Sequence, residues 1–157
     1  MIEPDAISAV VRRLRVIWLA LLMSVATLNA VVWFLLRSRA VSVASPLPPS
    51  TLTMLGVIVA LTLVLAPYVR KRVEAAPSNA TAEQIVSRWQ TGWIVGQAMK
   101  EGVGIAGLAI AMLAGTTTWA WAFAIASLGS MILTPPWEHE VRRRVQHATG
   151  SPLMSPR

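Results

Sequence analysis

The sequence predicts an all-α integral membrane protein of four transmembrane helices, arranged as two helical hairpins with short amphipathic helices at both ends. Two observations predict this fold class. Of the 157 residues, 55% are hydrophobic and only 13% are charged, whereas soluble domains carry about 25% charged residues. The apolar residues also gather in long uncharged runs, so hydrocarbon is the expected solvent. Residues 1–157 should form one membrane domain.

The chain should begin with an amphipathic helix over residues 4–15. Its apolar residues share one helix face and are Ile7, Val10, Val11 and Leu14. Arg12, Arg13 and Arg15 stand beside this stripe, so the helix is expected to lie along the lipid head groups and then turn into the membrane. The first span is the uncharged run 16–36.

The second span is expected at residues 51–69, which carry no charge and approach the roughly 20 residues that a bilayer core requires. The linker before it contains Pro46, Pro48 and Pro49, which exclude a regular helix. The two spans would therefore be joined by an irregular connection.

A long helix is predicted over residues 81–114, with the third span in its later part. Thr81 and Gln84 have the spacing of a capping box at its start. A turn at Gly115 leads into the fourth span, 117–134, which is shorter than the others and is stopped by two prolines. The remaining residues, 137–157, should form a basic tail that starts with a short surface helix.

Lysine and arginine residues predict the orientation. Three groups fall on one side of the membrane: Arg12, Arg13 and Arg15 before the first span, Arg70, Lys71, Arg72 and Arg88 between the second and third, and Arg142, Arg143, Arg144 and Arg157 in the tail. The opposite side holds only Arg37 and Arg39. The positive-inside rule then places both termini in the cytoplasm, at the inner (plasma) membrane. These cations are expected to meet anionic lipid head groups rather than nucleic acid.

Two charges interrupt the third span, Lys100 and Glu101. Each costs about 2.5 to 3.5 kcal/mol on insertion scales and usually marks function or packing. If hydrocarbon begins near Trp93, Glu101 lies roughly 12 Å inside it. The two side chains point about 100° apart, so they serve different faces of the helix.

Small residues share a stripe with the lysine and predict a groove for close helix packing. The stripe consists of Gly92, Gly96, Lys100, Gly104, Gly107 and Ala111. Glu101 faces elsewhere, towards another helix, another subunit or lipid. Gln97, one turn away, could donate a hydrogen bond to it.

Residues that could carry other chemistry do not form a recognisable site. No nucleotide-binding loop or catalytic triad is present, and there is no cysteine, so neither an enzyme nor a cofactor is expected. Glu138, His139, Glu140 and His147 set no compact ligand face, and a polar tail is favoured over a metal site. The tryptophans fit two aromatic belts at the membrane boundaries, with Trp18, Trp89, Trp93 and Trp137 on the cytoplasmic side and Trp33, Trp119 and Trp121 opposite.

The segment Glu101–Ala111, with the sequence EGVGIAGLAIA, resembles the carboxylate-bearing helix of ATP synthase proteolipid (c) subunits. The resemblance covers about a tenth of the chain. It implies that Glu101 is the carboxylate that binds the carried proton or sodium ion, and a proton would be held there because desolvation raises the pKa of a buried acid.

Two functions stay open at this point. The favoured one is a non-catalytic accessory or structural subunit of a larger inner-membrane complex, which could be a bioenergetic one, with Glu101 or Lys100 paired across the interface. The alternative is a proteolipid-like oligomer that binds or translocates an ion through Glu101. A small transporter or assembly factor is a more distant third.

Overall fold

The computed structural model describes residues 4–38, 47–77 and 80–149, which form five helices. They are α1 (Pro4–Arg37), α2 (Pro49–Glu74), α3 (Ala82–Ala114), α4 (Thr118–Ile132) and α5 (Glu138–Thr149). No strand occurs in the described residues, so the all-α prediction is confirmed. Arg39, Pro46, Arg157 and the end of the predicted tail, 150–157, lie outside them.

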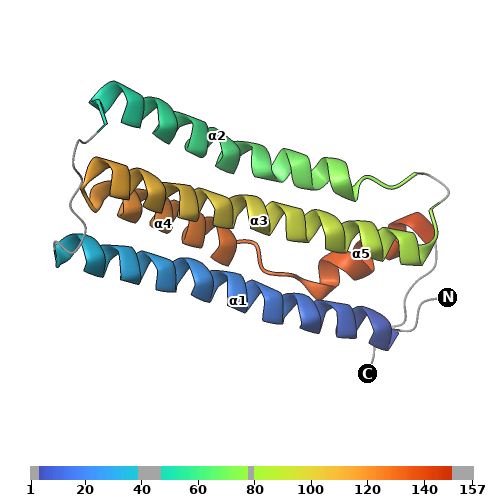
Figure 1. The fold of residues 1–157 in the computed structure, drawn as a ribbon. Coiled ribbons are helices and arrows are strands. Elements are labelled where there is room, and N and C mark those ends of the chain that lie inside the picture. Colours follow the sequence, from blue (N-terminus) through green and yellow to red (C-terminus); the bar gives the residue numbers. More distant parts are fainter. Residues whose placement is uncertain (1–3, 39–46, 78–79, 150–157) are drawn as a thin grey trace.

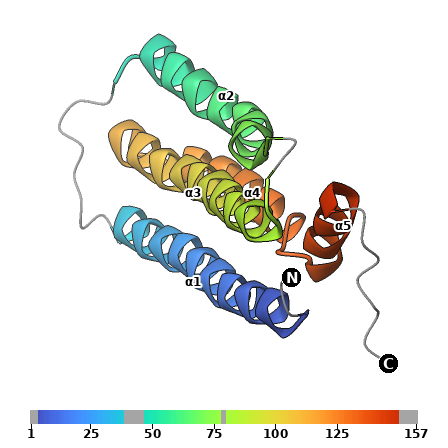
Figure 2. The same cartoon turned by 90° about the vertical axis from the view of Figure 1, so that its right-hand side faces the viewer.

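Helix α3 is the centre of the bundle. It contacts α2 most extensively, then α4 and α1, and α1 and α2 lie on opposite sides of it (Figures 1 and 2). The expected hairpin of the first two spans therefore does not form as a packed pair. The reason is that α3 carries the glycines at which a neighbouring backbone can approach closely.

Three helices, α1, α2 and α3, are long and apolar enough to cross a membrane. At a rise of 1.5 Å per residue, α1 and α3 are each about 50 Å long, well beyond a hydrocarbon core of about 30 Å. Helix α4 has 15 residues and is only about 22 Å long. Helices α1 and α3 are thus longer than a hydrocarbon core requires. Their starts lie at the end of the bundle where α5 lies (Figure 1).

Local sequence signals explain the two ends of α3. The side chain of Thr81 accepts a hydrogen bond from the backbone of Gln84, whose own side chain accepts one from the backbone of Thr81. This is the capping box that the spacing predicts. At the other end Gly115 adopts a left-handed φ of 67°, a conformation that glycine reaches without strain.

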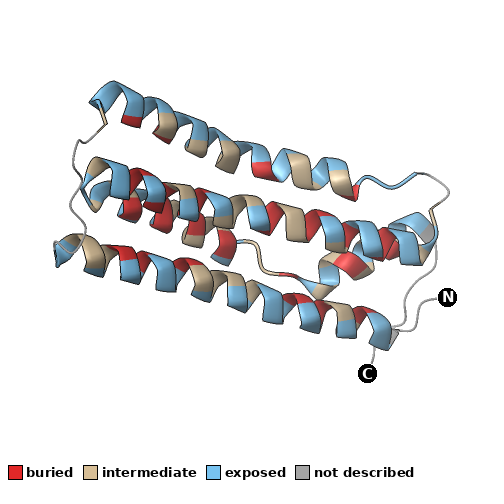
Figure 3. Ribbon diagram, in the orientation of Figure 1, coloured by how far each residue is buried: buried red, intermediate tan, exposed pale blue. Residues whose placement is uncertain are grey.

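The charged end of the bundle contains a small hydrophobic core of its own, which we call the three-helix cap. It joins the starts of α1 and α3 to α5. The buried members are Ile7, Val11, Leu14, Ile85, Val86, Trp89, Trp93, Val141 and Val145, and the red segments at this end of Figure 3 follow them.

At the three-helix cap the structure differs from two predictions made from the sequence, one for the N-terminal helix and one for the aromatic belt. Helix α1 runs without a turn from Pro4 to Arg37, and its apolar stripe packs on α3 and α5 instead of on lipid head groups. Trp89 and Trp93, expected in an aromatic belt, are each only 1% exposed. Both changes have one cause: α5 supplies an apolar face, Val141 and Val145, that covers these side chains.

Away from the cap, the helices pack through small residues. An added Cβ at Gly107 would clash with Phe123 of α4, and one at Gly56 of α2 would stand 2.8 Å from Trp119 of α4. The outer faces of α1 and α2 are exposed and apolar (Figure 3). This half of the molecule therefore presents its larger apolar side chains outwards, as a lipid-facing bundle does.

Candidate functional site at the end of the fourth helix

Helix α4 stops at Ile132, and the chain continues without helix to Trp137. Pro135 and Pro136 explain the break, since proline lacks the backbone donor and restricts the residue before it. A helix that ends leaves its last carbonyl groups without helical partners. In apolar surroundings each such carbonyl needs another donor.

Side chains from α1 and α3 donate to these carbonyls. Lys100 Nζ lies 3.0 Å from the carbonyl oxygen of Ser130, and Trp18 Nε1 lies 3.0 Å from that of Met131. The carbonyl oxygen of Thr134 accepts hydrogen bonds from Gln97 Nε2 at 2.8 Å and from Trp93 Nε1 at 3.3 Å. The break in α4 is thus closed by polar side chains that lie far away in the sequence.

Lys100 has a structural explanation in this arrangement. Its ammonium donates to the carbonyl of Ser130 and to the hydroxyl of Thr134, and it stands at the C-terminal, negative end of the α4 dipole. Ser127 Oγ of α4 donates back to the carbonyl of Lys100 at 2.7 Å. The lysine interrupts the stripe of small residues because it closes the end of the neighbouring helix.

Among the described residues the side chain of Gln97 makes no hydrogen bond to Glu101, which corrects the expected pair. Its amide nitrogen is bound to the carbonyl and the hydroxyl of Thr134, and the side chain is buried at 1% exposure. Its amide oxygen has no hydrogen-bond partner among the described residues. Gln97 therefore belongs to the end of α4 and leaves one acceptor unused.

Glu101 lies on a different side of α3, which we call the open face. Ala98, Gly102, Ile105 and Ala109 are exposed on this face, and Glu101 is partly exposed. A Cβ added at Gly102 would meet nothing within 4 Å. Within the described part of the chain, no hydrogen bond or ion pair reaches the Glu101 carboxylate.

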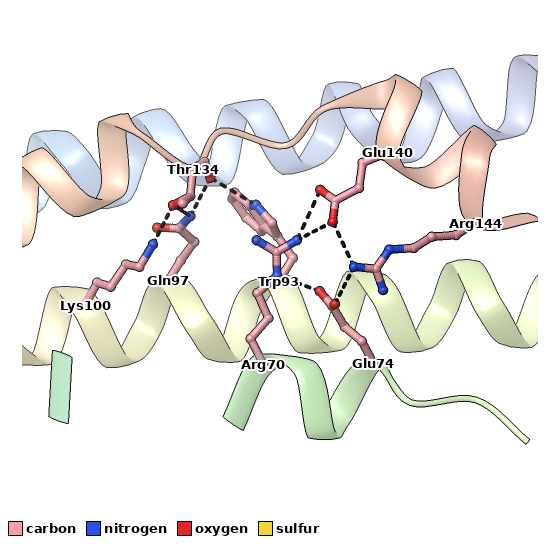
Figure 4. A network of polar contacts seen from close by, with 8 residues as sticks. All are labelled: Arg70, Glu74, Trp93, Gln97, Lys100, Thr134, Glu140 and Arg144. Atoms are coloured by element: carbon pink, nitrogen blue, oxygen red, sulfur yellow. Dashed lines mark hydrogen bonds and ion pairs between the residues drawn. The ribbon is translucent and has the colours of Figure 1, made fainter. Parts of the chain in front are cut away.

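A network of four charged side chains lies on the other side of α3, next to the cap (Figure 4). Arg70 of α2 is 2.6 Å from Glu74 and 3.0 Å from Glu140 of α5, and Arg144 is 2.9 Å from both carboxylates. The side chain of Glu74 is only 2% exposed. Gly92 gives this network its room, because a Cβ there would clash with Glu74.

The other stripe residues pack against three neighbouring helices. Gly96 faces the side chain of Arg70, and Gly104 faces Ser127 of α4 and Val25 of α1. Ala111 is fully buried in a cluster with Val32, Leu108 and Ala120. One end of the stripe thus receives α2, and the other receives α4 and α1.

The predicted head-group cations have two kinds of surroundings. Exposed cations stand around the charged end of the bundle: Arg12, Arg13, Arg15, Lys71, Arg72 and Arg143. Arg70, Arg142 and Arg144 are partly buried and bind carboxylates of the protein. Glu138 accepts hydrogen bonds from Arg142 and Ser8, and these, that of Arg142 most, hold the pKa of Glu138 below its ordinary value.

No family model, curated protein or solved structure matches the chain. The resemblance of Glu101–Ala111 to proteolipid subunits stays a prediction.

The sequence contained one unused signal for this site. An apolar run too short to span and ending in two prolines must leave carbonyl groups unpaired. The donors to them, Trp18 and Gln97 among others, carry no such signal, because nothing in the sequence reveals which side chains reach that point.

Proposed function

We propose that this protein is a non-catalytic accessory subunit of a larger inner-membrane complex, and that the open face of α3 is its docking surface. In this proposal the protein lies in the inner (plasma) membrane with both termini in the cytoplasm. Neither an enzymatic activity nor a cofactor is part of it.

The distribution of charge supports this placement. The starts of α1 and α3, the end of α2 and all of α5 lie at one end of the bundle (Figure 1). That end carries the arginine and lysine clusters, whereas Arg37 lies at the other end. The positive-inside rule assigns the arginine-rich end to the cytoplasm, where its exposed cations can meet anionic lipids.

The short α4 is compatible with a fourth membrane crossing. Non-helical backbone is tolerated at membrane depth only where protein covers it and satisfies its polar groups. The end of α4 and the segment after it approach this condition: Trp18 and Lys100 donate to the carbonyls of Met131 and Ser130 in the last turn of α4, and Gln97 donates to that of Thr134 in the segment. A short helix followed by a covered extended segment can return the chain to the cytoplasmic side.

The observation that carries the proposal is the carboxylate of Glu101, which has no partner among the described residues and lies on an otherwise apolar open face. A carboxylate facing hydrocarbon is costly and normally finds a partner. Its neighbours Ala98, Gly102 and Ala109 are small, which lets another helix approach closely. The partner that fits is a transmembrane helix with a basic or amide side chain at the depth of Glu101.

Native mass measurement after gentle detergent extraction tests this proposal. The wild-type protein should be recovered with a second membrane subunit, and Glu101→Gln should strongly reduce that recovery. Glu83→Gln is the matched control, because Glu83 is exposed in the first turn of the same helix. Recovery of the wild type as a monomer, or equal recovery of all three proteins with the partner, would contradict the proposal.

The alternative function is an oligomer that binds or translocates an ion through Glu101. The same unpaired carboxylate favours it, as does the resemblance of this segment to proteolipid subunits. Here the native particle would be a homo-oligomer, and a hydrophobic carbodiimide would label Glu101 with protection by sodium or by high pH. In this case Glu101 would be the ion-binding carboxylate, while the amide nitrogen of Gln97 stays bound to Thr134.

A further inference from the structure

A small cavity of about 50 Å³ lies between α2, α3 and the segment that follows α4. Arg70 and Ala66 line it from α2, Gly96, Gln97 and Lys100 from α3, and Thr134 from the segment after α4. It exists because α4 stops before this level, so no helix fills the space beside α2. Figure 4 shows Lys100, Gln97 and Thr134 grouped beside Arg70.

The cavity carries an excess of positive charge. Arg144 and Arg70 share Glu74 and Glu140. Lys100 binds only neutral oxygens, those of Ser130 and Thr134, and no carboxylate among the described residues reaches it. These five side chains therefore comprise three cations and two anions. A partly buried cation without a counter-charge is unfavourable in apolar surroundings, so an anion is expected here.

Gln97 indicates a second property of the ligand. Its amide oxygen is buried and has no donor among the described residues, and Gln97 is one of the residues that line the same cavity. Orphaned buried acceptors are rare. The ligand should thus combine an anion for Arg70 and Lys100 with a hydroxyl or amine hydrogen for Gln97.

The position of the cavity selects among such ligands. Arg70 is followed by the exposed cations Lys71 and Arg72 at the end of α2, where the proposed membrane placement puts the cytoplasmic head groups. Lys100 lies deeper along the bundle, beside the end of α4. The volume accommodates a few water molecules or one small anionic group, but no acyl chain. The acyl chains would have to remain outside, along α2.

We propose that this cavity binds the phosphate of an anionic phospholipid from the cytoplasmic leaflet, held between Arg70 and Lys100, with a head-group hydroxyl donating to Gln97. Phosphatidylglycerol has this chemistry, and phosphatidylcholine lacks both the net charge and the hydroxyl. The inference uses the membrane placement of the proposed function but not its partner subunit.

Native mass spectrometry of the purified protein, extracted with a defined lipid mixture, tests the site. The wild type should retain one phosphatidylglycerol in preference to phosphatidylcholine. Lys100→Met should lower this retention about tenfold, because a charge-assisted hydrogen bond is lost. Lys71→Met, which removes the same charge from an exposed position of α2, should change it less than about twofold.

A second variant keeps the test decisive if Lys100→Met fails to fold. Ala66 is 1% exposed and lines the cavity, so Ala66→Val should fill much of the space and displace the lipid without removing a charge. Unchanged retention in Ala66→Val would overturn the inference, because the lipid would then lie elsewhere.

Inorganic phosphate and the Glu101→Gln variant complete the experiment. If the protein retained inorganic phosphate as well as it retains phosphatidylglycerol, the lipid assignment would be overturned. The cavity would then be a site for a free anion. Failure to retain either ligand would indicate a cavity that holds water only, and would also overturn it. Glu101→Gln should leave lipid retention unchanged. A failure of the inference would therefore be seen in lipid retention, and a failure of the proposed docking face in recovery of the partner subunit.

Discussion

The three-helix cap and the apolar half of the bundle are built from the same helices, α1 and α3, yet they pack by different means. In the cap large side chains meet, with Trp89, Trp93 and Leu14 almost entirely buried. In the other half glycines pack against aromatic rings: Gly107 lies against Phe123, and Gly56 lies against Trp119. One helix thus changes its packing mode along its own length.

Under the proposed membrane placement, in which water surrounds the cap and lipid surrounds the other half, the solvent accounts for the difference. Where water surrounds the protein, burying large apolar side chains is the main driving force. In lipid that force is absent, and helices associate through close packing and interhelical hydrogen bonds. The polar contacts follow the same division: ion pairs between long side chains lie next to the cap, whereas Lys100 and Gln97 satisfy backbone carbonyls.

The largest expected effect is loss of the cap core. Trp89→Ala removes a side chain that is 1% exposed and should destabilise the cap by about 3 to 5 kcal/mol. Thermal unfolding in detergent, followed by circular dichroism, measures it. Trp137→Ala is the control, because Trp137 is 49% exposed and should change little. Equal stability of the two variants would show that the cap is not a packed core.

The next effect tests packing in the apolar half. Gly107→Leu should weaken the contact of α3 with α4 by roughly 1 to 3 kcal/mol or more, because the side chain would overlap Phe123. Gly102→Leu should be tolerated in the isolated subunit, since nothing lies within 4 Å of its Cβ position. Resistance to denaturation by an anionic detergent compares the pair. A greater loss in Gly102→Leu would reverse our assignment of the buried and open faces.

A smaller effect is expected at the end of α4. Gln97→Met removes one donor from the carbonyl of Thr134, which keeps its bond from Trp93. The cost should be about 1 kcal/mol, visible as faster amide hydrogen exchange at the end of α4. Gln90→Met is the control on the same helix. Unchanged exchange in both variants would mean that the side chain of Gln97 does not support the break.

The smallest effect concerns pH at the cap. Because Arg142 and Ser8 lower the pKa of Glu138, its contribution to stability is complete above the ordinary glutamate pKa. It is lost as the pH falls through the lowered value. Thermal unfolding of the wild type should therefore decline on acidification more than that of Glu138→Gln. High salt should reduce the difference, since the pair is partly exposed. Parallel pH profiles at low salt would argue against this pair.

The sequence predicted the parts of the molecule that depend on local or bulk properties. Two long uncharged runs and a third apolar run that Lys100 and Glu101 interrupt identified the three long apolar helices, and the Thr81–Gln84 spacing located the start of α3. Both follow from short-range physical chemistry: solvation of a continuous segment and hydrogen bonding over three residues. The charge of Lys100 and the break at Pro135 were equally visible in the sequence.

Only the tertiary structure decided which residues meet. It placed Lys100 at the end of α4, bound the Gln97 amide nitrogen to Thr134 instead of to Glu101, and buried Trp89 and Trp93 in a cluster with α5. None of these contacts follows from helical periodicity, because periodicity defines the faces of a helix but not the neighbour of each face. That choice depends on how helices far apart in the sequence fit together, and here it depends on the glycines of α3.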